Sequence, residues 1–263
     1  DSIMKFISIV LPTHFSEKNI CDWCESIFSS LSEEIINLIE IVQIESYPGD
    51  GSSEIVKDYC MKMSVQYKLI IQHPKGVYRA QEQGKLNAKG EWLVIVNSDD
   101  RLNGYSLKNI VKFLKEKVKK SSNVVFFPVF YESFGKKSGA PQKLNKLYDL
   151  DVIGSAHSVG MFIRKKTWEK LGAKYSNHKH CADYELYMRL LKENQNIEYP
   201  NNFEPIGTFY TGGYTSIYKS QFKIYLEKIS ILNKYGGKRA VLRNIFYYIN
   251  KFIKLLRSNN NKR

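Results

Sequence analysis

The segment from Trp92 to Val96 is a continuous apolar run that ends in four polar residues, Asn-Ser-Asp-Asp at positions 97–100. Its length and its β-branched residues predict a strand that is buried on both faces of a parallel sheet. Ligands of open α/β sheets bind just beyond the carboxyl ends of such strands. Two adjacent carboxylates at this point repel each other unless a cation lies close to them. The alternative is a loop in which Ser98 or Asp100 caps the next helix.

Strand-like and helix-like segments alternate through the first half of the chain. Apolar runs predict the strands, and apolar residues spaced three and four positions apart predict the helices. This alternation predicts an α/β fold with a mainly parallel sheet, right-handed crossovers and flanking helices. The predicted strands are Lys5–Leu11, Ile35–Ile44, Gln66–Gln72 and Trp92–Val96, and the predicted helices are Ser16–Leu31, Ser52–Met63, Tyr78–Ala88 and Leu107–Val118.

Polar loops follow three of the predicted strands. They are Pro12–His14, Glu45–Ser52 and Asn97–Asp100. Because the carboxyl ends of parallel strands meet at one edge of a sheet, these loops are expected to form a single binding crevice.

The pattern continues less regularly after residue 120. Strands are predicted at Val124–Tyr131 and Met161–Arg164, and a helix is predicted to begin at Tyr184. The polar segment Glu132–Gln142 indicates a loop or an edge hairpin. Residues 1–220 are therefore expected to form the α/β domain, and residues 221–263 a helical extension.

The charge of the chain is strongly basic, with a formal net charge of +14. Such a charge implies an anionic partner. Residues 238–263 contain basic residues and no acidic one, and apolar residues recur there at helical spacing. A basic amphipathic helix suits an anionic membrane surface, and the alternative is a helix that packs on the domain with a solvated basic face. The apolar positions are Leu242, Ile245, Phe246, Ile249, Phe252, Ile253 and Leu256.

Neither a membrane-spanning segment nor a signal peptide is expected, because no apolar run is long enough and no charged, apolar and small-residue regions open the chain. The four cysteines are too few for a disulfide scaffold and fit a reducing compartment. A zinc site at Cys21 and Cys24, or at His178, His180 and Cys181, lacks further ligands at suitable spacing. The expected location is the cytoplasm, at the inner face of the cell membrane.

Several segments together resemble inverting family 2 glycosyltransferases with the Rossmann-like GT-A fold, of the type that builds bacterial capsule, O-antigen and exopolysaccharide. The most specific of them runs from Ala88 through Asp100. The others are Ile7–Thr13, Glu45–Ile55, Gly76–Gly84, Ala182–Leu186 and Gly212-Gly213.

The resemblance implies a UDP-sugar donor and a Mn²⁺ or Mg²⁺ ion that neutralises the leaving diphosphate. It implies that Asp100 is the direct metal ligand and that Asp99 contacts the ribose or the waters of the metal. Pro12, Thr13 and His14 are expected to line the nucleoside pocket. Glu45 is expected on the base, where the family usually has Asp.

The resemblance also assigns residues to the chemistry. Asp183 matches the catalytic base that takes the proton of the acceptor hydroxyl, and its alternative role is an N-cap. His157 matches a histidine that contacts the sugar or the acceptor, and its alternative is a core histidine. Arg79, or else Lys85, is expected near the diphosphate, and the alternative for Arg79 is a solvated helix position. The acceptor is expected to be a glycan or lipid-linked saccharide.

Two other classes of protein are the alternatives. A sugar-phosphate nucleotidylyltransferase would need a Gly-rich basic loop after the first strand, where this chain has Pro12-Thr13-His14. A basic nucleic-acid-binding protein would need aromatic residues interleaved with its charges on a base-stacking sheet. This chain concentrates its excess charge in residues 238–263 and in Lys115–Lys120, without such a sheet pattern. A nucleic-acid partner is therefore not expected.

Overall fold

The computed structural model of the chain describes residues 5–118, 122–133, 136–140, 157–172, 174–175, 178–193, 196–200, 202–210 and 218–260. A seven-stranded sheet forms the centre, in the order β10-β6-β9-β4-β1-β2-β3. All of its pairings are parallel except those of β9 with β4 and β6, so the predicted mainly parallel α/β architecture is confirmed. The strands are β1 (Ile7–Thr13), β2 (Ile39–Glu45), β3 (Gln66–Ile71), β4 (Trp92–Ile95), β6 (Val124–Phe126), β9 (Met161–Arg164) and β10 (Ile197–Glu198).

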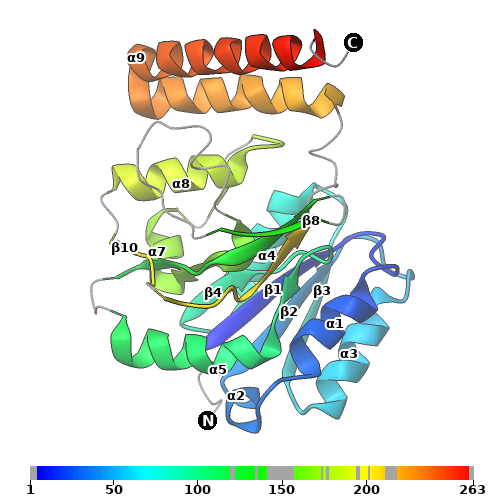
Figure 1. Ribbon diagram of the computed structural model, residues 1–263. Coiled ribbons are helices and arrows are strands. Elements are labelled where there is room, and N and C mark those ends of the chain that lie inside the picture. The colour runs from blue at the N-terminus through cyan, green and yellow to red at the C-terminus, as the bar shows by residue number, and fades with distance from the viewer. Residues whose placement is uncertain are drawn as a thin grey trace.

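The central strands are buried on both faces, which explains their unbroken apolar runs. Ile9 of β1 pairs with Ile41 of β2 and with Val94 of β4, and all three side chains are buried. Helices cover both faces of the sheet (Figure 1). One face carries α1 (Ile20–Phe28), α2 (Glu33–Ile36), α3 (Ser52–Lys62) and α5 (Gly104–Lys112), and the other carries α4 (Val77–Asn87), α7 (Lys165–Lys170) and α8 (Ala182–Lys192).

A second sheet has four strands, in the order β5-β11-β7-β8. The single strand predicted over Val124–Tyr131 is in fact two strands, β6 in the first sheet and β7 in the second. Its strands are β5 (Arg101–Leu102), β7 (Val129–Ser133), β8 (Lys136–Ala140) and β11 (Gly207–Tyr210). Pro128 separates β6 from β7, and proline cannot donate a backbone hydrogen bond to a ladder. β7 and β8 pair antiparallel, so the polar segment after β7 contains the edge hairpin that was one of the two predictions.

The C-terminal segment α9 (Tyr218–Asn260) consists of two helices joined at Gly237, whose φ is 71°. Figure 1 shows the two helices antiparallel, above α8. Ile231 and Leu232 of the first helix are fully buried in the same cluster as Leu186 and Leu190 of α8. The hydrophobic core therefore continues past residue 220, where the domain was predicted to end.

Gly104 begins α5 at a point where the chain passes very close to α1. A Cβ atom at this position would lie 1.9 Å from the carbonyl oxygen of Ile27. We expect Gly104→Ala to destabilise the protein by about 1–3 kcal/mol, because the contact is with backbone and cannot be relieved by a rotamer change. Urea unfolding would measure this, with the exposed Lys112→Ala in the same helix as control. Equal unfolding midpoints for the two variants would contradict the expectation.

Candidate active site

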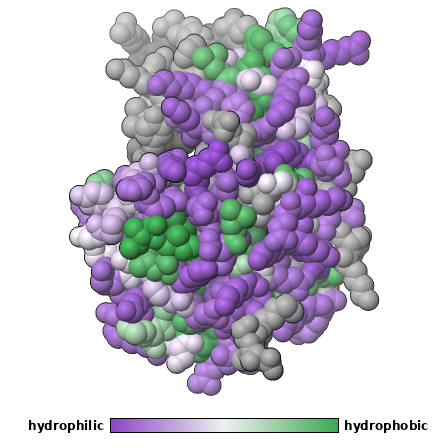
Figure 2. Space-filling model, turned by 180° about the vertical axis from the view of Figure 1, so that it is seen from behind, coloured by the Kyte–Doolittle hydropathy of each residue, from purple (hydrophilic) through white to green (hydrophobic). Residues whose placement is uncertain are grey.

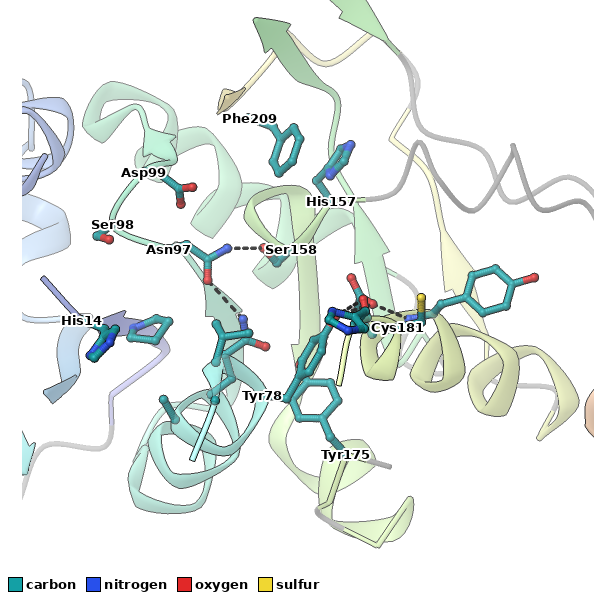
Figure 3. Close-up of a pocket in the computed structure, with 18 of the residues that line it drawn as sticks. His14, Tyr78, Asn97, Ser98, Asp99, His157, Ser158, Tyr175, Cys181 and Phe209 are labelled. Atoms are coloured by element: carbon teal, nitrogen blue, oxygen red, sulfur yellow. Dashed lines mark hydrogen bonds between the residues drawn. The ribbon is translucent and has the colours of Figure 1, made fainter. Parts of the chain in front are cut away.

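A cleft of about 900 Å³ opens at the carboxyl ends of β1, β2 and β4 (Figure 3). Its wall includes residues from all three polar loops that the sequence placed at this edge: Thr13, Ser46 and Asn97 are examples. The prediction of a single crevice built from separate pieces of chain is confirmed. α4, α8 and the first helix of α9 supply the opposite wall.

At one end of the cleft, Pro12, Thr13 and His14 line the wall. Phe15 joins them, with its ring centroid 4.6 Å from that of His14 and 4.0 Å from that of Tyr47. Phe15 has a φ of 50°, in the left-handed region that few residues other than glycine adopt. Nothing in the sequence pattern pointed to Phe15 or Tyr47, since a single aromatic residue in a loop carries no periodic signal.

Glu45 lies beneath the cleft and does not line it. Its carboxylate is buried, and it accepts hydrogen bonds from Thr13 Oγ1 (2.9 Å) and from the Tyr47 backbone N–H (2.9 Å). Burial raises its pKa above the ordinary value. The direct base contact predicted for Glu45 is therefore not provided by this geometry. Glu45 instead connects Thr13 at the end of β1 to the backbone that follows β2.

The acidic pair after β4 is divided between the surface of the cleft and the interior. Asp99 lines the cleft, whereas Asp100 is fully buried and does not. Asp100 Oδ2 accepts a hydrogen bond from Asn97 Nδ2 (3.1 Å), and Asp100 Oδ1 has no partner among the described residues. Burial and the neighbouring Asp99 raise the pKa of Asp100 to about 8. Asp99 is therefore the carboxylate that faces the cleft, although the resemblance implied that Asp100 is the direct metal ligand.

Asn97 connects this turn to two neighbouring segments by hydrogen bonds. Gln81 Nε2 of α4 donates to Asn97 Oδ1 (3.1 Å), and Asn97 Nδ2 donates to Ser158 Oγ (3.4 Å), as Figure 3 shows. The turn is therefore tied to α4 on one side and to the segment before β9 on the other.

The described residues contain no group of three or more His, Cys, Asp and Glu side chains that could hold a metal ion alone. A Mg²⁺ or Mn²⁺ ion at this site would be held by one or two carboxylates, with phosphate oxygens and water completing the shell. Asp99 at the wall and the unpartnered oxygen of Asp100 behind it fit that arrangement. Burial raises the pKa values of both groups, and the charge of Arg101 opposes that rise without cancelling it.

Asp183, in the first turn of α8, lies in the same cleft as Asp99. Its Oδ1 accepts hydrogen bonds from the Tyr184 backbone N–H (2.8 Å) and the Tyr78 hydroxyl (2.9 Å). Burial raises its pKa above the ordinary value, while these hydrogen bonds and the charge of Lys228 oppose that rise. A half-buried carboxylate with a raised pKa is well suited to accept a proton.

Tyr78, which donates a hydrogen bond to Asp183, packs in turn against other buried side chains. The Tyr78 ring lies 5.2 Å from that of Tyr175, and the Tyr175 hydroxyl accepts a hydrogen bond from Lys85 Nζ (2.8 Å). Lys85 is fully buried, 3.8 Å from the centroid of the Trp168 ring, and its pKa is lowered by burial. Lys85 is thus enclosed behind the cleft wall and cannot reach a diphosphate there without rearrangement.

Arg79 also lies apart from the cleft. Its guanidinium pairs with Glu82 at 2.6 Å, and it lines a separate cavity beside His73 and Lys75. Because α4 directs position 79 away from the cleft, this geometry does not provide the contact that was predicted between Arg79 and a diphosphate.

His157 lines the cleft, where its ring stacks on that of Phe209 at 3.7 Å (Figure 3). Burial lowers its pKa to about 4, so the imidazole is neutral near pH 7. His157 therefore presents an uncharged ring to the cleft.

The first helix of α9 contributes residues that the sequence did not identify. Ile224, Tyr225 and Lys228 line the cleft. The Lys228 ammonium lies 5.6 Å from the centroid of the Tyr184 ring, beside Asp183. No local pattern distinguishes this lysine from the others of the basic segment, and only the packing of α9 on α8 brings it to the site.

This fold and cleft define a glycosyltransferase of the GT-A class, with an acidic turn beyond a central strand and a carboxylate facing it from a helix. The chain belongs to glycosyl transferase family 2, whose family model matches residues 8–251. The resemblance inferred from the sequence is confirmed, and the assignment decides against the nucleotidylyltransferase and nucleic-acid-binding alternatives.

The chain is 26% identical over 258 residues to an uncharacterized glycosyltransferase of Haemophilus influenzae. The aligned region covers 95% of this chain and 98% of that protein. It is 28% identical over 116 residues to the poly(ribitol-phosphate) β-N-acetylglucosaminyltransferase TarS of Staphylococcus aureus, which covers 43% of this chain but only 19% of TarS.

Two solved structures share the fold. A TarS structure in complex with UDP-GlcNAc has a TM-score of 0.63 at 16% identity, over 87% of this chain and 66% of that one. A mannosyltransferase of Pyrobaculum calidifontis in complex with GDP-Man and Mn²⁺ has a TM-score of 0.64 at 14% identity, over 87% of this chain and 63% of that one.

Proposed function

We propose that the protein transfers a sugar from a UDP-sugar to a hydroxyl of a glycan or lipid-linked saccharide, with inversion at the anomeric carbon, in bacterial surface polysaccharide synthesis. The proposal depends on one observation: Asp99 and Asp183, which are far apart in the sequence, line the same cleft. The nucleotide-sugar complexes of the two structural relatives support the class of donor.

In this proposal the nucleoside and the diphosphate of the donor bind at different positions along the cleft. The nucleoside lies against Pro12, Thr13 and His14, with Phe15 beside them. The diphosphate lies near Asp99, where Mn²⁺ or Mg²⁺, when bound, would compensate the negative charge that develops on the leaving group. Asp99 is the direct ligand in this proposal, and Asp100 supports it from the interior.

Asp183 acts on the acceptor. Its carboxylate takes the proton from the acceptor hydroxyl as the oxygen attacks the anomeric carbon, and a single displacement inverts the configuration there. The Tyr78 hydroxyl and the Tyr184 N–H hold one carboxylate oxygen. The neutral His157 can hydrogen-bond to the sugar or the acceptor without adding charge.

A thermal-shift screen of nucleotide sugars, with and without Mn²⁺, tests the proposal. A donor held at about a hundred times its Kd stabilises the folded state by about 2.7 kcal/mol, which raises the Tm by about 5 °C or more. We expect this rise for a UDP-sugar with Mn²⁺ and a smaller rise with EDTA. A GDP-sugar that stabilises more than every UDP-sugar would overturn the assigned base, and an equal shift with EDTA would overturn the metal requirement.

We also propose that the protein lies at the inner face of the cell membrane, with α9 on an anionic lipid surface. Of the described residues, no helix is long and apolar enough to cross a membrane. The second helix of α9 buries Ala240 and Asn244, while Leu242 and Phe246, one turn apart, are 55% and 65% exposed. Figure 2 shows the described part of α9 as largely hydrophilic with apolar side chains among the polar ones. One face therefore packs on the protein while the other leaves apolar and basic side chains available to lipid.

Replacing Leu242 and Phe246 together with serine should weaken binding to vesicles that contain phosphatidylglycerol. Each side chain contributes about 1.5–3 kcal/mol when it is fully removed from water, so the affinity should fall at least tenfold. Co-sedimentation measures it, with phosphatidylcholine vesicles as the lipid control and the exposed Leu86→Ser of α4 as the protein control. Equal sedimentation of the double variant and the wild type would contradict a membrane role for this face.

A further inference from the structure

Glu227 is the only acidic residue between Tyr218 and the C-terminus, a segment rich in lysine and arginine. Its carboxylate accepts hydrogen bonds from three consecutive backbone N–H groups of the loop before α8. The donors are Lys179 (3.1 Å, to Oε1), His180 (2.8 Å, to Oε2) and Cys181 (3.0 Å, to Oε2).

Three successive N–H groups that converge on one point form an anion-binding concavity. Here they stand just before α8, whose N-terminus favours negative charge because of the helix dipole. Glu227 occupies this concavity from α9. The Cys181 thiol adds a contact to the same helix, because its Sγ lies 3.5 Å from the carbonyl oxygen of Ile224.

The loop that Glu227 holds leads directly to Asp183. On its other side, the Tyr78 hydroxyl lies 2.9 Å from the His180 carbonyl oxygen and 2.9 Å from Asp183 Oδ1. The loop is therefore held between α4 and α9, and the position of Asp183 depends on both attachments. Glu227 also fixes the turn of α9 that presents Lys228 to the cleft.

We propose that Glu227 is a positioning residue for Asp183, which makes the first helix of α9 part of the catalytic apparatus. The proposal rests on the proposed function of Asp183 as the base. A catalytic group must be held within about 0.5 Å of its productive geometry, and a displacement of about 1 Å can cost on the order of a hundredfold in rate. Loss of the carboxylate should therefore lower kcat while the donor KM, set at the other end of the cleft, stays unchanged.

The experiment compares Glu227→Ala, Glu227→Gln and the control Asn233→Ala, an exposed position of the same helix. In Glu227→Ala we expect kcat to fall by about 10- to 100-fold with an unchanged donor KM. Glu227→Gln keeps one acceptor oxygen and should lie between Glu227→Ala and the wild type. Asn233→Ala should match the wild type.

Two readouts need no substrate. Cys181 is buried, so in a Cys21→Ser background, which removes the exposed thiol, it should react slowly with a thiol reagent. In Glu227→Ala, Cys181 should react faster, and the amides of residues 179–181 should exchange hydrogen faster. Adding Cys181→Ala to the same background shows which thiol reacts.

Unchanged thiol reactivity and amide exchange in both Glu227 variants would overturn the proposal, whatever the activity. Faster exchange with an unchanged kcat would also overturn it, since the loop would then be freed without moving the base. Full activity of Asp183→Asn would instead refute the assignment of Asp183 as the base. That result would distinguish a failure of the proposed function from a failure of the Glu227 proposal. If Glu227→Ala does not fold, the same comparisons apply to Glu227→Gln.

Discussion

Asp183→Asn should lower kcat by a factor of about 10²–10⁴, the usual contribution of a general base, and leave the affinity for UDP unchanged. The substitution keeps the volume of the side chain and removes its ability to take a proton. Steady-state transfer kinetics and calorimetric titration with UDP measure the two quantities. Turnover at the wild-type rate would mean that the base lies elsewhere.

The pH dependence of kcat provides an independent check on Asp183. Burial raises its pKa above the ordinary aspartate value, so activity should fall as the pH drops through that raised pKa. The charge of Lys228 opposes the rise. In Lys228→Met the pKa of Asp183 should therefore be higher still, and the acidic limb of the profile should move to higher pH. A shift to lower pH would contradict this account of the cleft.

Asp99→Asn should remove the Mn²⁺-dependent part of UDP binding and lower kcat by about 10²–10³, the scale of losing one electrostatic stabiliser of the leaving group. UDP titrations of the variant in Mn²⁺ and in EDTA should then give the same Kd. The expected reason is that Asp99, and not Asp100, faces the cleft.

Asp100→Asn is the matched comparison, because it removes the neighbouring carboxylate and keeps its shape. Since Asp100 is buried beneath Asp99, its replacement should retain part of the metal dependence. If Asp100→Asn abolishes the metal dependence and Asp99→Asn retains it, Asp100 is the direct ligand, as the resemblance first implied.

The sequence was a good guide wherever a side chain's environment depends on its near neighbours in the chain. The runs at Lys5–Leu11 and Trp92–Val96 predicted buried strands, and the corresponding strands β1 and β4 form at the centre of the sheet. The polar loops after them had to meet at one edge, because parallel strands bring their carboxyl ends together. Asp183 could be singled out because the motif around it and its place at a helix start are both local.

The sequence was a poor guide to the direction in which a side chain points. Arg79 and Asp100 lie in the predicted helix and loop, and Glu45 ends β2 where the loop was expected to begin. Each carboxylate or guanidinium is nevertheless turned into the interior or into another cavity. One position along a loop or a helix is enough to move a side chain from a cleft to the core, and a motif does not resolve that difference. Asp99 and Asp100 are adjacent, and burial alone separates them.

The amino-acid sequence by itself determined the α/β architecture, the family and the edge of the sheet at which the cleft forms, because periodicity and strand direction are properties of short segments. Only the tertiary structure decided which acid faces the cleft, and that Tyr78, Glu227 and Lys228 surround Asp183. These three residues come from α4 and α9, far from α8 in the chain, and only the burial of apolar faces against the sheet and against α8 brings them together.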